Sequence, residues 1–365
     1  MKALILAGGY ATRLRPLSCQ KPKLLFPVAG RPIIERTIEA LKKAGVDEVV
    51  LAVNYLADVL ESHLKSEYAG VKITYSRDPS PLGTAGPIKL AEKVLKGSDP
   101  FLAFNGDILF ETDLKEMVAL HRERRAVATI ALREVDEPSR FGVVVLDGEM
   151  RVREFVEKPK KEEAPSNLIN AGIYVMSPQI LSYIPPGRRF SSEEDVFPVL
   201  AKEKKLYAYR YQGGWFDIGT TEDFRNANRH YLEKISRNEP LIQETASVHG
   251  SACLKPPLLI CAHSTVEADA EVGPYSVIGS KNTIKEHSVI TESILFDDVY
   301  VGASSTMRGC TLGDGVYIGD RVTLGRNVVI AEGAKLDSGV KVADDVCICS
   351  YREIKEDIVD PGLAL

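Results

Sequence analysis

The sequence predicts an α/β domain built on a mostly parallel sheet, followed by a parallel β-helix of hexapeptide repeats. Two observations lead to this fold. Strand-like and helix-like apolar patterns alternate over residues 1–235, and an apolar residue recurs at about every sixth position between residues 260 and 348. We therefore place the first domain at 1–232, a linker at 233–247 and the β-helix domain at 248–365.

Each element of the first domain follows from its apolar pattern. The predicted order is strand 3–7, helix 32–44, strand 48–53, helix 55–64, strand 71–75, helix 84–95, strand 101–104, helix 112–124 and strand 127–132. Such alternation with short connections is typical of a parallel sheet covered by helices on both faces. Ligands of these sheets bind at the carboxyl ends of strands, near the reversal of strand order. We therefore look for functional residues directly after Ala7 and after Phe104.

The second domain is predicted from its period of six, with one-residue slips before Val301 and Leu312. The apolar series is Ile260, Val266, Val272, Ile278, Ile284, Ile290, Phe296, Val301, Met307, Leu312, Ile318, Leu324, Ile330, Leu336, Val342 and Ile348. An amphipathic helix cannot produce this period, whereas stacked coils of short strands can. Residues 351–365 break the period, and we expect them to cap the last coil.

The composition excludes two large classes of function. The 365 residues are 44% hydrophobic with a net charge of −5, so we expect a folded core and no nucleic-acid partner. No apolar run reaches the ~18 residues of a membrane span, and no signal-peptide pattern opens the sequence. We therefore expect a cytoplasmic protein without a membrane partner. The acidic excess lies in residues 245–365, so residues 1–244 are nearly neutral and could bind an anion.

A glycine pair follows the first predicted strand, in the run Leu6-Ala7-Gly8-Gly9. The next segment contains four cations, which are Arg13, Arg15, Lys21 and Lys23. Glycines at this place let backbone N–H groups approach a phosphate or a base closely. The pattern is neither a P-loop nor a dinucleotide fingerprint. A solvated basic loop is the alternative, but four cations near the carboxyl end of a strand favour phosphate binding.

Two separated acids are candidates for a metal site. Asn105-Gly106-Asp107 follows a buried strand, and Asp217 lies in the apolar run Trp215-Phe216-Asp217-Ile218. An acid in an apolar setting is costly to bury unless it is paired or bound to a metal. Two carboxylates that meet at one site suit Mg²⁺, which shares its oxygen ligands with phosphates. Taken alone, Asp107 could equally be a turn residue.

Six motifs in order resemble those of the sugar-1-phosphate nucleotidylyltransferases, the NDP-sugar pyrophosphorylases. They are Leu6-Ala7-Gly8-Gly9 with Thr12-Arg13-Leu14, Pro22-Lys23, Asn105-Gly106-Asp107, Glu157-Lys158-Pro159, Asn170-Ala171-Gly172 and Asp217-Ile218-Gly219. The resemblance covers about residues 1–232 and implies a Rossmann-like nucleotidyltransferase domain. Many members of the family continue into a left-handed parallel β-helix, which matches the hexapeptide repeats. One departure is Ala11, where the family usually has glycine, and this puts the contacts of residues 10–12 in doubt.

Two further segments are most similar to the mannose-1-phosphate guanylyltransferases within that family. These are Pro81-Leu82-Gly83-Thr84-Ala85-Gly86-Pro87 and Asp195-Val196-Phe197-Pro198. The resemblance implies that a nucleoside triphosphate, here GTP, reacts with a sugar 1-phosphate, here mannose 1-phosphate. The products would be an NDP-sugar and pyrophosphate, with Mg²⁺ as the cofactor.

The resemblance also implies roles for individual residues. Arg13 and Lys23 would hold the triphosphate, and Lys158 would hold the sugar phosphate as catalytic groups. Asp107 and Asp217 would hold Mg²⁺. The expected substrate-binding residues are Leu6, Ala7, Gly8, Gly9, Gly83, Gly86, Asn105, Asp107, Gly142, Glu157, Asn170 and Asp217.

Three other interpretations stay open. The enzyme could use UTP or dTTP with glucose 1-phosphate, because the phosphate and metal motifs are shared. The β-helix could be an acetyltransferase, since His249, His263 and His287 lie in or near it. The chain could instead be a non-catalytic regulator, although every expected charged residue is present. We expect the β-helix to form a homo-oligomer, whose size the sequence does not give.

Overall fold

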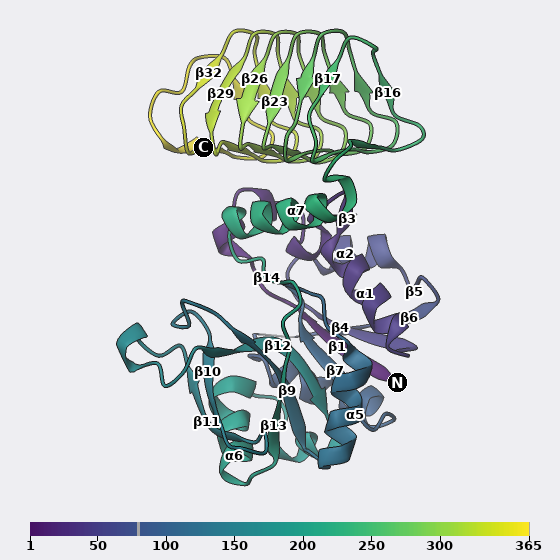
Figure 1. Ribbon diagram of the computed structural model, residues 1–365, viewed down its shortest axis with the longest axis vertical. Helices are drawn as coiled ribbons and strands as arrows, with labels where there is room; N and C mark the ends of the chain where they lie inside the picture. Colours follow the sequence, from purple (N-terminus) through teal and green to yellow (C-terminus); the bar gives the residue numbers. More distant parts are fainter. Residues whose placement is uncertain (79–80, 365) are drawn as a thin grey trace. The chain divides into compact units, whose positions relative to one another are not determined.

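The computed structural model describes residues 1–78 and 81–364, which form two compact units (Figure 1). The first unit comprises Met1–Tyr10 and Ile34–Asp217, and the second comprises Ala11–Ile33 and Ile218–Leu365. The compact units therefore group residues 11–33 with the β-helix, although we place these residues in the first sequence domain. The helix α7 (Thr221–Ser236) also runs into the predicted linker.

A parallel core lies at the centre of the first unit. Its strands are β1 (Lys2–Ala7), β4 (Glu48–Val53), β6 (Val71–Arg77) and β7 (Phe101–Asn105). β1 pairs in parallel with β4 on one side and β7 on the other, and β4 pairs in parallel with β6. The chain moves outward from β1 to β6 before it crosses to β7, so the strand order reverses between β1 and β7. The predicted parallel sheet is confirmed in this core.

Strands from later in the chain extend the sheet with antiparallel pairs, in the order β11-β10-β12-β7-β1-β4-β6-β5. The remaining strands of the unit are β5 (Glu67–Tyr68), β8 (Ile108–Phe110), β9 (Ala128–Glu134), β10 (Gly142–Leu146), β11 (Val152–Glu157), β12 (Leu168–Met176), β13 (Leu206–Arg210) and β14 (Trp215–Asp217). Only a short connection joins β10 to β11, so these two strands pair in antiparallel direction, since a parallel pair needs a long crossover. β9 pairs with β12 and in parallel with β13.

The helices of the first unit are α1 (Ile33–Lys43), α2 (Ala57–Leu64), α3 (Gly86–Leu90), α4 (Glu92–Leu95), α5 (Leu114–Arg124) and α6 (Phe197–Lys202). All except α6, for which the sequence pattern predicted no helix, lie close to their predicted positions. The single helix predicted at 84–95 is divided into α3 and α4, because Ala91 adopts a non-helical φ of −81° and ψ of 5°. Asp113 caps α5 by accepting the backbone N–H of Lys115 at 2.8 Å.

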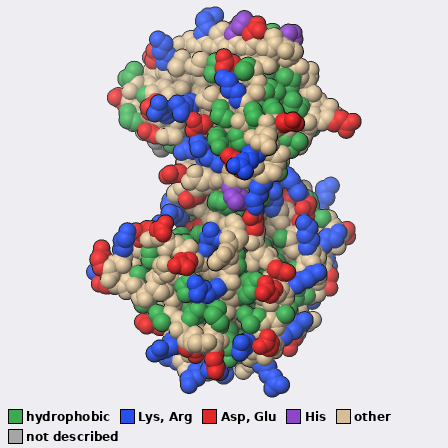
Figure 2. Space-filling view, in the orientation of Figure 1, with side chains coloured by type: hydrophobic (Ala, Val, Ile, Leu, Met, Phe, Trp, Pro, Cys, Tyr) green, Lys and Arg blue, Asp and Glu red, His purple; other side chains and the backbone are tan. Residues whose placement is uncertain are grey.

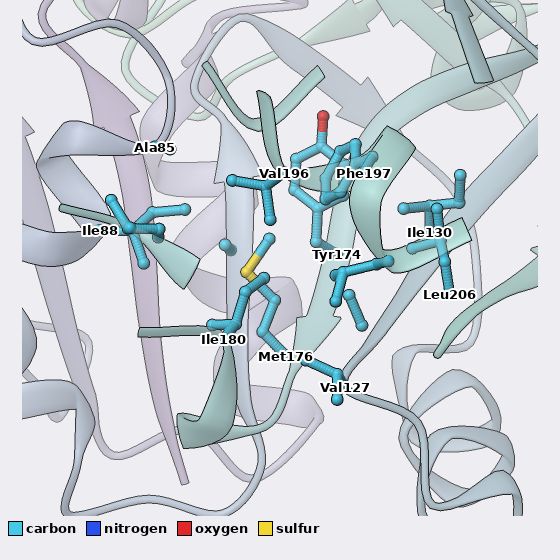
Figure 3. Packing of buried hydrophobic residues seen from close by; sticks show 14 of the residues in the cluster. Ala85, Ile88, Val127, Ile130, Tyr174, Met176, Ile180, Val196, Phe197 and Leu206 are labelled. Carbon is cyan, nitrogen blue, oxygen red and sulfur yellow. The ribbon is translucent and has the colours of Figure 1, made fainter. Parts of the chain in front are cut away.

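An apolar core packs between the sheet and α6. Tyr174 and Phe197 lie beside each other at its centre, with ring centroids 5.3 Å apart (Figure 3). The hydroxyl of Tyr174 points away from the apolar side chains drawn there, although the whole residue is only 2% exposed. A buried hydroxyl needs a polar partner, and this one leads to the candidate site described below.

The second unit is dominated by the predicted β-helix, whose coils are stacked (Figure 1). Its strands form three parallel sheets, of eight, seven and six strands in the described residues. They are β15 (Leu241–Ile242), β16 (Ser247–Val248), β17 (Cys253–Leu254), β18 (Leu258–Ile260), β19 (Thr265–Val266), β20 (Glu271–Val272), β21 (Ser276–Ile278), β22 (Thr283–Ile284), β23 (Val289–Thr291), β24 (Ile294–Leu295), β25 (Tyr300–Val301), β26 (Thr306–Arg308), β27 (Thr311–Leu312), β28 (Tyr317–Ile318), β29 (Thr323–Arg326), β30 (Val329–Ile330), β31 (Lys335–Leu336), β32 (Lys341–Val342), β33 (Val346–Ile348), β34 (Glu353–Ile354) and β35 (Gly362–Ala364). The fold class is thus confirmed.

One member of the predicted apolar series is wrong. Leu295, not Phe296, stacks between Ile278 and Leu312 inside the β-helix. The first one-residue slip therefore comes before residue 295. Because a shift by one residue turns a side chain to the opposite face of a strand, Phe296 points out of the coil. It is nevertheless only 1% exposed, since other residues of the second unit cover it.

Residues 11–33 form an irregular segment of short elements in the second unit. It contains 3-10 helices at Thr12–Leu14, Leu17–Cys19 and Lys23–Leu25 and the small strands β2 (Pro27–Val28) and β3 (Arg31–Pro32). We call Ala11–Ile33 the loop segment.

None of the helices in the described residues has the length and apolar character needed to cross a membrane. On the face shown in Figure 2, acidic and basic side chains are interspersed.

Candidate active site

The reversal of strand order brings two predicted motifs together. The backbone N–H of Gly106, after β7, donates to the carbonyl oxygen of Leu6 in β1 at 3.0 Å. Gly8 and Gly9 follow β1 at the same edge of the sheet. A Cβ on Gly9 would meet no atom within 4 Å, so a ligand can approach its backbone, whereas one on Gly8 would lie 3.4 Å from Asn54 Cβ. This edge has the geometry expected of a ligand site in an open α/β sheet.

The two predicted metal acids lie at the same end of a two-stranded sheet. β8 and β14 pair in antiparallel register, with Asp217 opposite Ile108, the residue that follows Asp107 in the chain. No group of three or more His, Cys, Asp or Glu residues in 1–78 and 81–364 is arranged to hold a metal. A divalent ion here would thus need further oxygens from water or phosphate. Two carboxylates completed in this way are a normal donor set for Mg²⁺, so the residues present fit that ion.

A bulge in β12 fixes the surroundings of Asn105. The register between β12 and β9 shifts between Asn170 and Tyr174, and Gly172 in the bulge has a φ of +73°. A Cβ on Gly172 would lie 2.9 Å from Asn105 Nδ2, so the backbone packs directly on this amide. Asn105 Oδ1 is buried and has no hydrogen-bond partner among the described residues. A buried acceptor without a donor is costly, so a ligand is expected to supply one.

Glu157 and Lys158 form an ion pair at the end of β11. Lys158 Nζ lies 2.9 Å from Glu157 Oε1, and its side chain is 65% exposed. Burial raises the pKa of Glu157, an effect that Lys158 partly offsets. Gly142 lies against this pair, because a Cβ there would be 2.8 Å from Glu157 Oε2 and 2.5 Å from Phe155 Cζ. These three predicted residues are therefore neighbours.

A chain of hydrogen bonds extends from Asn170 to the segment 81–87. Asn170 Nδ2 donates to the hydroxyl of Tyr174 at 2.9 Å, and this hydroxyl donates to Glu193 Oε1 at 3.3 Å. Glu193 Oε2 accepts from the hydroxyl of Thr84 and, at 3.0 Å, from that of Ser191. Burial is the main cause of the raised pKa of Tyr174, so it remains a donor. We call Asn170, Tyr174, Glu193 and Thr84 the relay.

Glu193 and Tyr174 are functional candidates that no sequence motif predicted. The only signal for Glu193 in the sequence is its place in Ser191-Ser192-Glu193-Glu194, just before an apolar run. Nothing in that run tells which of the two neighbouring glutamates is buried. In the structure, Glu193 is 9% exposed, whereas Glu194 is exposed. The partners of Glu193 come from distant parts of the chain, so no local pattern identifies it.

The segment 81–87 is held by backbone contacts with residues 188–190. Gly83 has a φ of +76°, and a Cβ there would lie 2.5 Å from the carbonyl oxygen of Phe190. The N–H of Ala85 donates to that same oxygen at 3.0 Å. A Cβ on Gly86 would meet Leu82 Cβ at 2.5 Å. Both predicted glycines therefore allow this segment to pack closely. The missing side chains would also let a nucleotide base approach the backbone.

Asp78 is a further carboxylate that the sequence analysis missed. It follows β6 at the carboxyl end of the strand, where the rule applied to Ala7 and Phe104 would have found it. Its Oδ1 is buried without a hydrogen-bond partner among the described residues, and burial raises its pKa to about 6.

Arg13 and Lys23 belong to the second unit, within the loop segment. The guanidinium of Arg13 lies 3.0 Å from where a Cβ on Gly219 would be, two residues along the chain from Asp217. Ala11 adopts a left-handed conformation with φ 46° and ψ 43°, which explains why glycine suits this position. Its carbonyl oxygen accepts from the N–H of Leu14 at 3.0 Å.

Comparison with known proteins agrees with both halves of the fold. The family model described as "Nucleotidyl transferase" matches residues 2–234, and the one described as "GMPPB C-terminal domain" matches residues 254–363. Mannose-1-phosphate guanylyltransferase 1 of Arabidopsis thaliana is 40% identical over 339 residues, covering 88% of this chain and 93% of the relative. Mannose-1-phosphate guanyltransferase of Candida albicans is 38% identical over 338 residues, covering 87% and 92%.

The fold of the first part is also found in solved structures. A putative glucose-1-phosphate thymidylyltransferase from Bacillus anthracis, in complex with a sucrose, is 29% identical with a TM-score of 0.58. The match covers 62% of this chain and 94% of that chain. The fold, the arrangement of the motifs at the sheet edge and these matches lead to one conclusion: the chain belongs to the nucleotidyl transferase family.

Proposed function

We propose that this enzyme transfers the guanylyl group of GTP to mannose 1-phosphate, giving GDP-mannose and pyrophosphate. The observation that supports the proposal is the pairing of β8 with β14, in which Asp217 lies opposite Ile108, the residue that follows Asp107. This pair lies at the edge of the sheet where the strand order reverses. The choice of GTP and mannose is supported by the names of relatives that align with most of this chain.

The reaction sets a problem of charge rather than of proton transfer. An oxygen of the sugar phosphate attacks the α-phosphorus of the nucleotide, and pyrophosphate leaves in line. That oxygen is already anionic, so no strong general base is needed. Catalysis must instead position two anions and stabilise the charge that develops between them. Mg²⁺ held by Asp107 and Asp217 would neutralise part of this phosphate charge.

The sugar 1-phosphate would be bound at both of its ends, the phosphate and the sugar hydroxyls. Lys158 would hold the phosphate through its ammonium group, while Glu157, 2.9 Å away, would accept hydrogen bonds from sugar hydroxyls. Asn170 and the backbone of Gly142 would bind other hydroxyls.

The nucleotide would be bound by a second set of residues. The residues Leu6–Gly9 and Asn105 would line the nucleotide, while Gly83 and Gly86 would approach its base. Arg13 and Lys23 would hold the triphosphate and stabilise the leaving pyrophosphate.

Activity in GTP, mannose 1-phosphate and Mg²⁺ tests the proposal. The wild-type chain should form GDP-mannose and pyrophosphate in equal amounts, and chelation by EDTA should stop both. Asp107→Asn and Lys158→Met should each lower kcat by at least ~10²-fold, the size expected when a preorganised charge is removed. Lys160→Met is the matched control, since the Lys160 side chain is 78% exposed and pairs with Glu163 at 3.6 Å. Equal activity of Lys158→Met and Lys160→Met would overturn the role of Lys158.

We also propose that the β-helix forms a homo-oligomer. Supporting this, the stacked rings of Tyr300 and Tyr317 lie 4.8 Å apart on one sheet, and Tyr317 is 44% exposed. Light scattering with the wild type and with Tyr317→Lys tests this. Loss of the oligomer in the variant is expected, and a monomeric wild type would contradict the proposal.

A further inference from the structure

The loop segment is packed closely on the β-helix. A Cβ on Gly30 would lie 2.8 Å from Leu259 Cδ2 and 2.9 Å from Cys261 Sγ, so the backbone lies directly against β18 and the residue that follows it. The N–H of Ala29 donates to Asn228 Oδ1, a buried acceptor on α7, at 2.7 Å. The C-terminal end of the segment is thus fixed by contacts that leave no room for another side chain.

Three buried aromatic rings form a second attachment. Phe26 of the loop segment contacts Phe224 of α7 with centroids 5.5 Å apart, and Phe296 of the β-helix at 5.6 Å. Both contacts are edge-to-face, an arrangement that aromatic rings favour beyond the area that they bury. Phe296 is the residue that the hexapeptide period misassigned to the interior. Its outward position thus has a structural role, because it provides the surface against which Phe26 packs.

The third attachment is an ion pair across 293 residues of sequence. Lys21 Nζ lies 2.6 Å from Asp314 Oδ2, and the two side chains are only 23% and 27% exposed. Asp314 is itself fixed, because its Oδ1 accepts the N–H of Asp297 at 3.1 Å. The ammonium of Lys21 also lies 5.1 Å from the ring centroid of Phe296. Lys21 therefore binds the β-helix, whereas the sequence analysis grouped it with the phosphate-binding cations.

Lys23 lies between these attachments. It follows Lys21 by two residues and precedes Phe26 by three, in a 3-10 turn closed by the bond from Phe26 N–H to Lys23 O at 2.9 Å. With both ends of this short stretch held, few backbone conformations remain for Lys23. A cation held in place in this way binds a phosphate without first losing conformational entropy.

We propose that Asp314 of the β-helix is a positioning residue for the reaction, because it holds Lys21 and thereby fixes the backbone of Lys23. The inference rests on the proposed function, in which Lys23 binds the triphosphate. It gives the β-helix a part in catalysis, beyond assembly. Loss of the ion pair leaves the aromatic contacts intact and loosens the stretch around Lys23, so the nucleotide must order it on binding.

The experiment compares Asp314→Asn, Lys21→Met and the double variant in the full chain. Glu267→Gln is the matched control, since the Glu267–Lys285 pair has a 2.5 Å contact and side chains 31% and 30% exposed, both within the β-helix. We expect Asp314→Asn to lower kcat/KM for GTP by about tenfold. KM for mannose 1-phosphate should stay within about twofold, because Lys23 does not bind that substrate. The double variant should be no worse than the worse single variant.

Hydrogen exchange supplies a readout that does not depend on activity. Amides of residues 24–26 should exchange faster in Asp314→Asn than in Glu267→Gln, while those of β24 and β27 should not change. Kinetics equal to those of Glu267→Gln, additive losses in the double variant, or unchanged exchange at 24–26 would each overturn the inference. If the wild type transfers no nucleotide at all, the proposed function fails. The exchange data then still decide whether Asp314 fixes this stretch.

Discussion

Gly172→Ala tests the coupling between the bulge in β12 and the candidate site. Gly172 has a φ of +73°, and a new Cβ would lie 2.9 Å from Asn105 Nδ2, 3.1 Å from Ile108 Cγ1 and 3.2 Å from Asn105 Cβ. These contacts involve the base as well as the tip of the Asn105 side chain. Rotation of the amide alone therefore cannot relieve them, and Asn105 or β12 must move.

The expected magnitude has two parts. A left-handed backbone costs an L-residue ~1 kcal/mol, which a stiffer unfolded chain partly offsets. Overpacking in a close-packed interior adds ~1–3 kcal/mol. Gly187→Ala is the control, because Gly187 has a φ of +71° with no atom within 4 Å of its Cβ position. This variant therefore carries only the cost of the left-handed backbone, and the difference between the two variants gives the cost of overpacking. Gly172→Ala should therefore be less stable than Gly187→Ala by ~1–3 kcal/mol.

The assay is urea unfolding followed by tryptophan fluorescence. Trp215 is the sole tryptophan of the sequence, and its Nε1 donates to the carbonyl oxygen of Ala171 at 2.9 Å, next to the substitution. Its emission thus reports on the relevant unit. Because Asp107 follows Asn105 by two residues, kcat of Gly172→Ala should also fall by at least ~10-fold, while Gly187→Ala keeps it. Equal unfolding free energies and equal kcat for the two variants would refute the reasoning.

Two further predictions concern buried polar groups. Glu193→Gln removes the charge that accepts from Thr84 and Tyr174, so it should lower the unfolding free energy by ~2 kcal/mol and reduce kcat/KM for both substrates. The exposed Glu194→Gln is its control, and equal behaviour of the two would contradict the relay. Burial, with a smaller effect from Arg122, lowers the pKa of His121 from 6.5 to about 4, so the unfolded chain binds the proton more readily. The unfolding free energy should therefore fall as the pH drops from 6.5 towards 4. In urea titrations, His121→Gln should reduce this dependence of the unfolding free energy on pH. An unchanged dependence in the variant would show that His121 does not cause it.

Local patterns predicted the fold well because each follows from the repeat of its element. The alternation in the first part identified the strands that end at Ala7 and Asn105, and the period of six identified the coils of the β-helix. The same reasoning failed at Phe296, because a one-residue slip in the coil can be placed at either of two adjacent apolar residues. Only the register with Ile278 shows that Leu295 takes the inner position.

The site was predictable where chain order and motif spacing determine it, and not where distant partners do. Glycines after β1 and acids near β7 and β14 could be read from the sequence. The burial of Glu193 depends on Tyr174 and Thr84, which lie 19 and 109 residues away. The pairing of Lys21 with Asp314 depends on how the loop segment packs on a β-helix coil. Such partners are set by tertiary structure, so residue type and spacing alone do not show them.

The most direct test of the account is a pyrophosphate-release panel with the wild-type chain and Mg²⁺. It crosses GTP, UTP, dTTP, ATP and CTP with the 1-phosphates of mannose, glucose and N-acetylglucosamine. We expect the highest kcat/KM for GTP with mannose 1-phosphate. A preference for UTP or dTTP with glucose 1-phosphate would keep the chemistry and contradict the assignment of base and sugar. No release with any pair would contradict the proposed catalytic function itself.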